Sequence, residues 1–241
     1  MKISKKVASK VSNIPNSKVF TYRDVLEQPE EREATIKALN RMVKAGKLKK
    51  LSRGRYYRAE ESVFGPLAPP QKEVVSDLLW REGKRIGYLS GLSIYPELGL
   101  TTQISNTIQV AANDIRPTFK RGKYKISFIR QKNPITEENI PQLQILDAIR
   151  YIKKIPDSPI PTVCARLKGI LVKFSNPTLR EMVDLAEKYP PSTRALLGAL
   201  LEATGNWDYR QRLKSRLNPI TQYRYPEAEI ELPTAKEWNI V

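Results

Sequence analysis

Residues 31–45 read EREATIKALNRMVKA, which predicts an amphipathic helix with one apolar and one basic face. Ile36, Leu39 and Val43 recur at the spacing of a single helical face. The acidic first turn suits the positive end of a helix dipole, and Gly46 is placed to end the helix. Polar and basic side chains gather on a different face: Lys37, Asn40, Arg41 and Lys44. This second face is a candidate recognition surface for the major groove of DNA, with Asn40 or Arg41 near the base edges.

A short helix is predicted just before it, in the stretch VFTYRDVLE at residues 19–27. Thr21 and Asp24 have the spacing of a capping box, and Phe20 and Val25 that of a hydrophobic staple. Pro29 limits the length of this helix. An earlier helix, ending near residues 13–15, is predicted from apolar residues at helical spacing: Ile3, Val7, Val11 and Ile14.

After the long helix, residues 49–60 read KKLSRGRYYRAE and predict a basic hairpin with Gly54 at its turn. Its candidate phosphate contacts are Lys49, Lys50, Arg53, Arg55 and Arg58. Three helices followed by a hairpin predict a winged helix-turn-helix DNA-binding domain at residues 1–60. The alternative for both the helix face and the hairpin is a solvated charged surface.

Charge is concentrated in the same region. The chain has 241 residues, with 42 Lys and Arg against 25 Asp and Glu, a net charge of +17. Residues 1–60 contain 16 basic and 6 acidic side chains, so a quarter of the chain carries more than half of the excess. Such a balance favours a polyanionic partner, either nucleic acid or an acidic protein surface.

The remainder is predicted to be a proline-rich linker at residues 61–70 and a larger domain at residues 71–241, first mixed α/β and then mainly helical. The fold class expected for the whole chain is therefore α+β. The pattern of small residues Ala195, Gly198 and Ala199 indicates close helix packing inside that domain rather than dimerisation.

A second basic cluster follows residue 115, in a stretch without acidic residues whose KRGKYK resembles SRGRYY of the first hairpin. Its members are Arg116, Lys120, Arg121, Lys123 and Lys125. A second nucleic-acid surface, a docking face for an acidic partner, plain solvation and long-range steering all remain open for this cluster.

Enzymatic chemistry has little support in the sequence. There is no histidine, which excludes Ser-His-Asp and Cys-His catalysis and His-ligated zinc, and the single Cys164 is expected in the core. Asp147 lies in a helical pattern, where we expect it to pair with Arg150 or Tyr151 or to cap a neighbour. We therefore expect no catalytic residues, metal or cofactor. With no signal peptide and no apolar run of membrane-spanning length, a cytoplasmic protein is expected.

The chain resembles the AbiEi-type antitoxins of bacterial abortive-infection and type IV toxin–antitoxin systems. The resemblance covers nearly the whole chain and is carried by the N-terminal segment and by four stretches: GYLSGLSIYPELGLTTQISNTIQVA (87–111), IRPTFKRGKYKISFIRQ (115–131), YPPSTRALLGALLE (189–202) and LPTAKEWNI (232–240). None of these motifs is catalytic.

The resemblance implies a winged helix that binds repeats in its own promoter and represses the operon, with DNA contacts at Lys37, Arg41, Lys44, Arg53 and Arg55. It also implies a C-terminal domain that counters a nucleotidyltransferase toxin in phage defence, either by binding it or indirectly. Two alternatives are a protein-interaction module and a stand-alone winged-helix regulator without a toxin.

Overall fold

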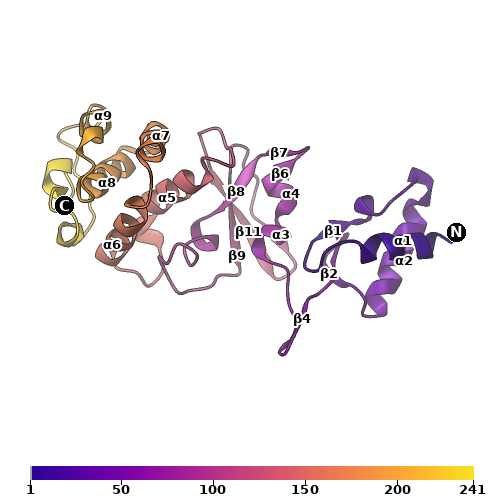
Figure 1. Cartoon of the computed structure of the whole chain (residues 1–241). Coiled ribbons are helices and arrows are strands. Elements are labelled where there is room, and N and C mark those ends of the chain that lie inside the picture. Colours follow the sequence, from indigo (N-terminus) through magenta and orange to yellow (C-terminus); the bar gives the residue numbers. More distant parts are fainter. Residues whose placement is uncertain (1) are drawn as a thin grey trace. The chain divides into compact units, whose positions relative to one another are not determined.

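A computed structural model describes residues 2–241 and divides the chain into two compact units. The first unit contains residues 1–78 and 119–125, and the second contains residues 79–118 and 126–241. Helices and several small sheets alternate along the chain, which confirms the α+β class (Figure 1). The boundary expected at residues 61–70 lies inside the first unit, because residues 71–78 and 119–125 pack with the N-terminal segment.

The first unit begins with the three helical segments and the hairpin expected from the sequence. Its elements are α1 (Ile3–Ser12), β1 (Phe20–Thr21), a 3₁₀ turn at Tyr22–Asp24, a second at Pro29–Glu31, α2 (Arg32–Lys44), β2 (Lys49–Ser52) and β3 (Arg55–Tyr57). The three strands form an antiparallel sheet in the order β1-β3-β2. The chain therefore closes its hairpin onto the strand that precedes the short helical turn.

A small apolar core holds these elements together, because each contributes buried side chains to it. Its fully buried members are Val7, Val11, Phe20, Val25, Ala38, Leu39, Leu48 and Tyr56. Helices α1 and α2 pack against each other across this core. The residues expected from helical periodicity, Val7, Val11 and Leu39, are thus in the core, while Ile36 is only partly buried.

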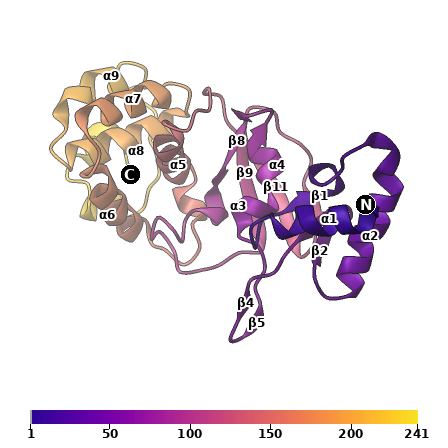
Figure 2. The ribbon, with the colours of Figure 1, turned by 45° about the vertical axis from the view of Figure 1, so that its right-hand side comes forward.

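The proline-rich segment at residues 61–70 forms a hairpin where a linker was expected. Strands β4 (Glu61–Ser62) and β5 (Gly65–Pro66) pair, and the Ser62 hydroxyl donates a hydrogen bond to the Gly65 carbonyl at 2.8 Å. Figures 1 and 2 show this hairpin extending away from the rest of its unit. Val63 and Phe64 at the tip are 94% and 97% exposed. Helical turns α3 (Gln71–Val74) and α4 (Ser76–Leu79) follow it.

The second unit contains most of a twisted sheet whose strand order is β10-β11-β9-β8. These strands are β8 (Gly87–Ser90), β9 (Thr107–Ala112), β10 (Phe119–Arg121) and β11 (Tyr124–Arg130). Strand β10 and the first two residues of β11 belong to the first unit. A short hairpin of β6 (Trp80–Arg81) and β7 (Lys84–Arg85) precedes β8. β8 and β9 pair antiparallel with Leu89 opposite Val110.

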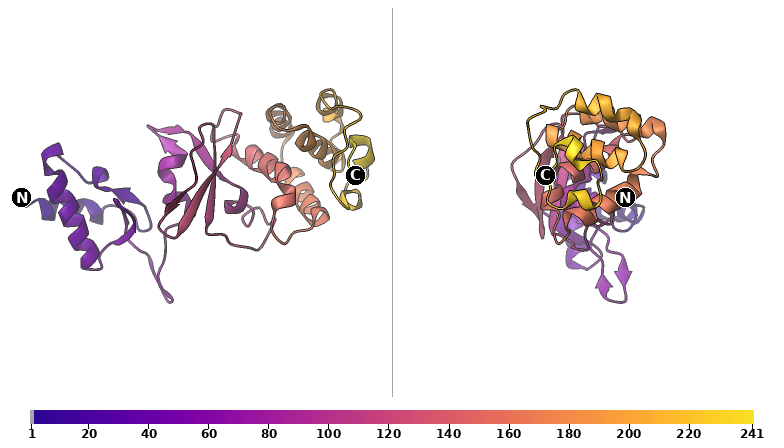
Figure 3. Two further views of the ribbon diagram at one scale, coloured as in Figure 1. Left: turned by 180° about the vertical axis from the view of Figure 1, so that it is seen from behind. Right: turned by 90° about the vertical axis from the view of Figure 1, so that its left-hand side faces the viewer.

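Helices cover the sheet on one side and complete the core of this unit. They are α5 (Ile140–Arg150), α6 (Ile160–Leu171), α7 (Asn176–Ala186), α8 (Pro191–Glu202) and α9 (Arg210–Lys214), followed by 3₁₀ turns at Ala228–Ile230 and Ala235–Trp238. Figure 3 shows α5 between the sheet and the later helices, and α5 contacts β8, α7 and α8. The expected order, mixed α/β and then helical, is confirmed. No helix within residues 2–241 combines the length and apolar character needed to cross a bilayer.

Gly198 on α8 lies directly against the indole ring of Trp238, which confirms the expected close packing within this domain. A Cβ atom at position 198 would lie 2.2 Å from the Trp238 ring. Trp238 is 1% exposed, and its Nε1 donates to Glu202 Oε2 at 2.9 Å. The glycine therefore provides the space into which the C-terminal segment docks.

Gly198→Ala is expected to destabilise the protein by about 1–3 kcal/mol, because the added methyl group overpacks the ring site. Gly169→Ala on α6 is the matched control, since nothing lies within 4 Å of its added Cβ. That change should stabilise the helix by about 0.5–1 kcal/mol. Urea denaturation measures both, and equal effects of the two substitutions would contradict the packing role.

Candidate nucleic-acid interface

The short helical turn before α2 is fixed by the capping box that the sequence predicts. The Thr21 amide donates to Asp24 Oδ2 at 2.6 Å, and the Arg23 amide donates to Thr21 Oγ1 at 3.3 Å. Phe20 and Val25, on either side of this turn, are buried in the core. The element is a 3₁₀ turn of three residues rather than an α-helix. It sets the direction in which the chain enters α2.

Helix α2 buries one face and exposes the other. Thr35, Ala38 and Leu39 are buried. The four candidate contacts, Lys37, Asn40, Arg41 and Lys44, are exposed. Lys37 lies 3.8 Å from Glu33, a solvated pair one turn earlier. Arg41 and Lys44 form no ion pair with any carboxylate of residues 2–241, so their charges are available to a partner.

Asn40 differs from its neighbours because its side chain already has a partner. The Tyr56 hydroxyl donates to Asn40 Oδ1 at 3.1 Å, which ties α2 to β3. A bidentate contact with adenine needs both the oxygen and the nitrogen of the amide. Asn40 could make that contact only by sharing Oδ1 between adenine and the Tyr56 hydroxyl, which restricts the rotation of its side chain. Arg41 is therefore the better candidate for a base-edge contact.

The β2–β3 hairpin presents part of its basic set to solvent. Lys49, Lys50 and Arg53 are exposed, and Gly54 at the turn has a φ of +73°, a conformation that favours glycine. The register shifts between Lys50 and Ser52, which accounts for the imperfect alternation of the sequence there. The exposed hairpin contacts are therefore fewer than the sequence suggested.

Arg55 is held inside its own unit, together with Arg121, by Asp77. Arg55 Nη2 lies 2.6 Å from Asp77 Oδ2, and Arg121 Nη1 lies 2.5 Å from Asp77 Oδ1. Arg121 also donates to the Val74 carbonyl at 2.7 Å and is only 6% exposed. Burial of Asp77 opposes its ionisation, but the two guanidinium groups outweigh it and hold its pKa below the usual value. The placement of Arg121 on an exposed second surface is corrected: its side chain is buried in the first unit and pairs with Asp77.

Arg58 also makes an internal contact. Its Nη1 donates to the Ser12 carbonyl at 3.1 Å, at the C-terminal end of α1, where unpaired carbonyls attract a cation. It is half-buried. Arg58 therefore joins the end of the hairpin strand to α1 rather than extending into solvent.

The rest of the second cluster is exposed: Arg116, Lys120, Lys123 and Lys125. Lys120, Lys123 and Lys125 belong to the first unit, and Arg116 to the second. Two further exposed cations of the first unit were not among the candidates from the sequence. They are Arg23 and Arg32, whose guanidinium carbons lie 6.0 and 5.3 Å from the centre of the Tyr22 ring. With all its segments, the first unit holds 21 Lys and Arg against 9 Asp and Glu.

Features of metal-dependent or thiol chemistry do not accompany this surface. Within residues 2–241, no three His, Cys, Asp or Glu side chains group as metal ligands would. Cys164 is buried in the second unit, and burial raises the pKa of its thiol to about 12. A thiol in that environment stays protonated and packs as an apolar side chain.

Residues 6–171 match a protein family that is described as a family of unknown function, DUF6088. The chain belongs to this family. The DUF6088 segment includes every candidate DNA contact of α2 and the β2–β3 hairpin and ends with α6. No curated protein matches the sequence.

Among solved structures, the chain is similar to the RV2827C protein from Mycobacterium tuberculosis. The two share 14% sequence identity, with a TM-score of 0.57, over 93% of this chain and 85% of that one. At this level of identity the likeness concerns the fold alone.

Proposed function

We propose that this protein binds double-stranded operator DNA through an N-terminal winged helix-turn-helix and represses its own operon. The observation that carries the proposal is the exposed face of α2, where Arg41 and Lys44 have no acidic partner among the described residues. The capped turn before α2 and the sheet order β1-β3-β2 support it. In this arrangement α2 enters the major groove, and exposed cations of the hairpin contact the phosphates.

The contacts in this proposal fall into two groups. Lys37, Arg41, Lys44, Lys49, Lys50 and Arg53 are exposed and contact DNA. Asn40, Arg55 and Arg58 keep their internal hydrogen bonds and hold the reading surface in place. Phosphate neutralisation supplies most of the affinity, and Arg41 supplies a base contact.

The proposal extends to an antitoxin of the AbiEi type that antagonises a nucleotidyltransferase toxin. Its support is the sequence resemblance over nearly the whole chain, in particular the stretch at residues 87–111. The second unit would carry this activity, and the protein would have no catalytic role of its own.

Binding to the DNA upstream of its own gene is the test of the regulatory half. With Arg41 at a base edge, five cations face phosphates, and they predict that log K falls with log salt concentration with a slope of about −4.5. Arg53→Ala should make this slope less steep by about one unit, because it removes one phosphate contact. Fluorescence anisotropy at several salt concentrations measures both.

Equal affinity for upstream and unrelated duplexes, or a slope near zero, would reject the regulatory half. For the antitoxin half, co-expression with a nucleotidyltransferase encoded beside the gene should restore the growth of cells that the toxin arrests. Failure to restore growth would reject that half alone.

A further inference from the structure

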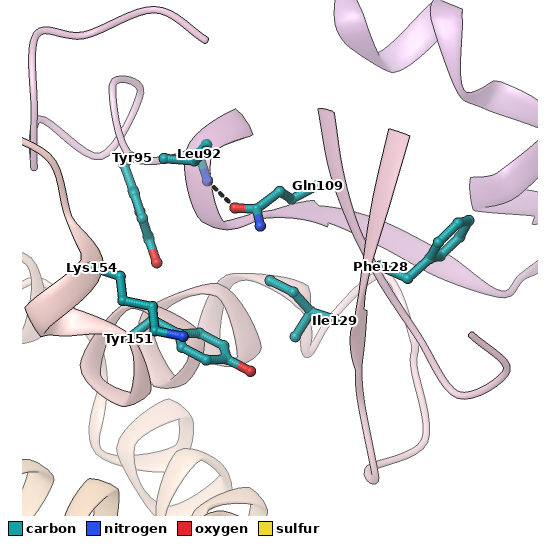
Figure 4. Close-up of a pocket in the computed structure, with 7 residues that line it drawn as sticks. All are labelled: Leu92, Tyr95, Gln109, Phe128, Ile129, Tyr151 and Lys154. Carbon is teal, nitrogen blue, oxygen red and sulfur yellow. Dashed lines mark hydrogen bonds between the residues drawn. The ribbon is translucent and has the colours of Figure 1, made fainter. Parts of the chain in front are cut away.

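A hollow in the second unit is lined by basic and aromatic side chains and lies outside the DNA-facing surface. Its volume is about 460 Å³, within the range of small-molecule sites. The end of α5 and the 3₁₀ turn after it (Ile152–Lys154), the start of α8, and residues 222–225 supply the walls. The lining residues are Arg150, Tyr151, Lys153, Lys154, Ser192, Gln222, Tyr223, Arg224 and Tyr225. An adjoining hollow of about 290 Å³ shares Tyr151 and Lys154 with it. Figure 4 shows the side chains that line this second hollow.

The charges of this hollow are all of one sign. Arg150, Lys153, Lys154 and Arg224 line it without a carboxylate among the other lining residues. All four are exposed, and none forms an ion pair with an acidic side chain of residues 2–241. Elsewhere in the same unit, exposed cations such as Arg212 and Arg216 have acidic partners. Four unpaired cations around one cavity favour a ligand with several negative charges.

Tyrosine rings hold three of these cations in position. The Arg150 guanidinium lies 5.0 Å from the centre of the Tyr151 ring, and the Lys154 ammonium lies 5.4 Å from it. The Lys153 ammonium lies 4.9 Å from the centre of the Tyr225 ring. Cation–π contacts restrict long side chains without neutralising them. Because the rings already carry cations, they serve to position charge rather than to stack a base.

Tyr223, one of the lining residues, has a buried hydroxyl without a partner among the described residues. Tyr223 is 7% exposed, and its hydroxyl has no hydrogen-bond partner within residues 2–241. The neighbouring Tyr225 hydroxyl, by contrast, donates to the Ser192 carbonyl at 3.2 Å. Main-chain bonds to the C-terminal segment fix both tyrosines, from the Tyr223 amide to Asn239 and from the Tyr225 amide to Val241, each 2.7 Å. A buried hydroxyl left unpaired is costly, and a ligand oxygen would satisfy it.

We propose that this hollow binds a small oligophosphate anion, with the di- or triphosphate group of a free nucleotide as its natural bearer. Phosphate oxygens accept hydrogen bonds from Arg150, Lys153, Lys154 and Arg224, and the Tyr223 hydroxyl donates one more. The site is independent of DNA binding by the first unit. It gives the second unit a ligand of its own.

Titration of the full-length protein with pyrophosphate and with ATP, each without metal, tests the proposal by isothermal titration calorimetry. One saturable site per chain is expected. Tyr223→Phe should weaken binding about tenfold, because it removes one hydrogen bond to a charged oxygen. The melting temperature of the free protein should not fall, since the hydroxyl has no partner to lose.

The double variant Lys153→Glu with Arg224→Glu should abolish saturable binding. Its matched control, Lys173→Glu with Lys188→Glu, makes the same change in net charge at exposed positions of the same unit and should bind within twofold of the wild type. Unchanged affinity in Tyr223→Phe, or a loss that follows Arg41→Glu with Lys44→Glu in the first unit, would overturn the proposal. So would binding of a 5′-phosphorylated single-stranded oligonucleotide with no binding of ATP or pyrophosphate.

Discussion

Replacing Arg41 and Lys44 together with glutamate is expected to lower affinity for the upstream DNA more than 100-fold. Each change removes a cation from the exposed face of α2 and places a negative charge against the phosphates. Loss of one good base contact alone removes about 1–3 kcal/mol of discrimination between sequences. Each introduced glutamate is also repelled by the DNA phosphates. Preference for the upstream sequence over unrelated DNA should disappear with the affinity. Fluorescence anisotropy with the two duplexes measures both quantities.

The fold should persist in that pair, because both side chains are exposed and make no ion pair with residues 2–241, and the reversed charge in the last turn of α2 costs about 0.3–1 kcal/mol per residue. The control is again Lys173→Glu with Lys188→Glu, which changes the net charge equally in the second unit. If the two double variants bind upstream DNA within threefold of each other, α2 is not the reading surface. Thermal unfolding of all three proteins checks that they are folded.

Asp147→Ala is expected to cost about 3–5 kcal/mol of stability, the largest effect of any single substitution considered for the second unit. Asp147 Oδ2 accepts hydrogen bonds from the Tyr88 hydroxyl at 2.7 Å and the Ser90 hydroxyl at 2.8 Å, and Oδ1 accepts from the Tyr189 hydroxyl at 2.9 Å. Each buried hydroxyl left unpaired costs about 1–3 kcal/mol. Asp208→Ala, at an exposed position, should change stability by less than about 0.5 kcal/mol. Urea denaturation distinguishes the two, and similar midpoints would contradict a structural role for this network.

The same carboxyl gives stability a pH dependence. Burial raises the pKa of Asp147, against the opposing hydrogen bonds of its three hydroxyl donors. An aspartate in the unfolded chain titrates near ~3.9. The folded protein therefore binds the Asp147 proton more tightly than the unfolded chain does. The contribution of protonated Asp147 to the free energy of unfolding is complete below about pH 4, and it is lost as the pH rises through the raised pKa. Asp147→Asn cannot titrate, so its free energy of unfolding should lack that decline. The difference in free energy of unfolding between the wild type and this variant should therefore become smaller from pH 4 to pH 8.

Local chemistry made the elements of residues 1–60 predictable from the sequence. The capping box of Thr21 and Asp24, the apolar spacing of α2 and the left-handed Gly54 each depend on residues within a few positions of one another. Such signals survive folding because the backbone groups they satisfy are neighbours in the chain. They placed α2 within one residue at each end of the expected range.

Partners distant in the chain could not be predicted in this way. Asp77 lies 22 residues from Arg55 and 44 from Arg121, so no local pattern announced the cluster that removes both arginines from the exposed set. Asp147 was expected to pair with Arg150 or Tyr151 or to cap a neighbour. Its hydrogen-bond donors come instead from β8 and from the segment before α8, which are distant in the chain, and Arg150 acts on it only through its charge. Likewise, an unpaired hydroxyl such as that of Tyr223 has no signature in sequence.

The chain enters its N-terminal unit twice, first with residues 1–78 and again with residues 119–125. Transplanting this unit onto another protein therefore requires both segments. A chimera joined at residue 60 lacks Asp77 and Arg121 alike, and one joined at residue 78 leaves Asp77 and Arg55 without the buried guanidinium of Arg121. Recombination between relatives meets the same constraint: a crossover between residues 78 and 119 separates Asp77 from Arg121, whereas a crossover after residue 125 inherits both from one parent.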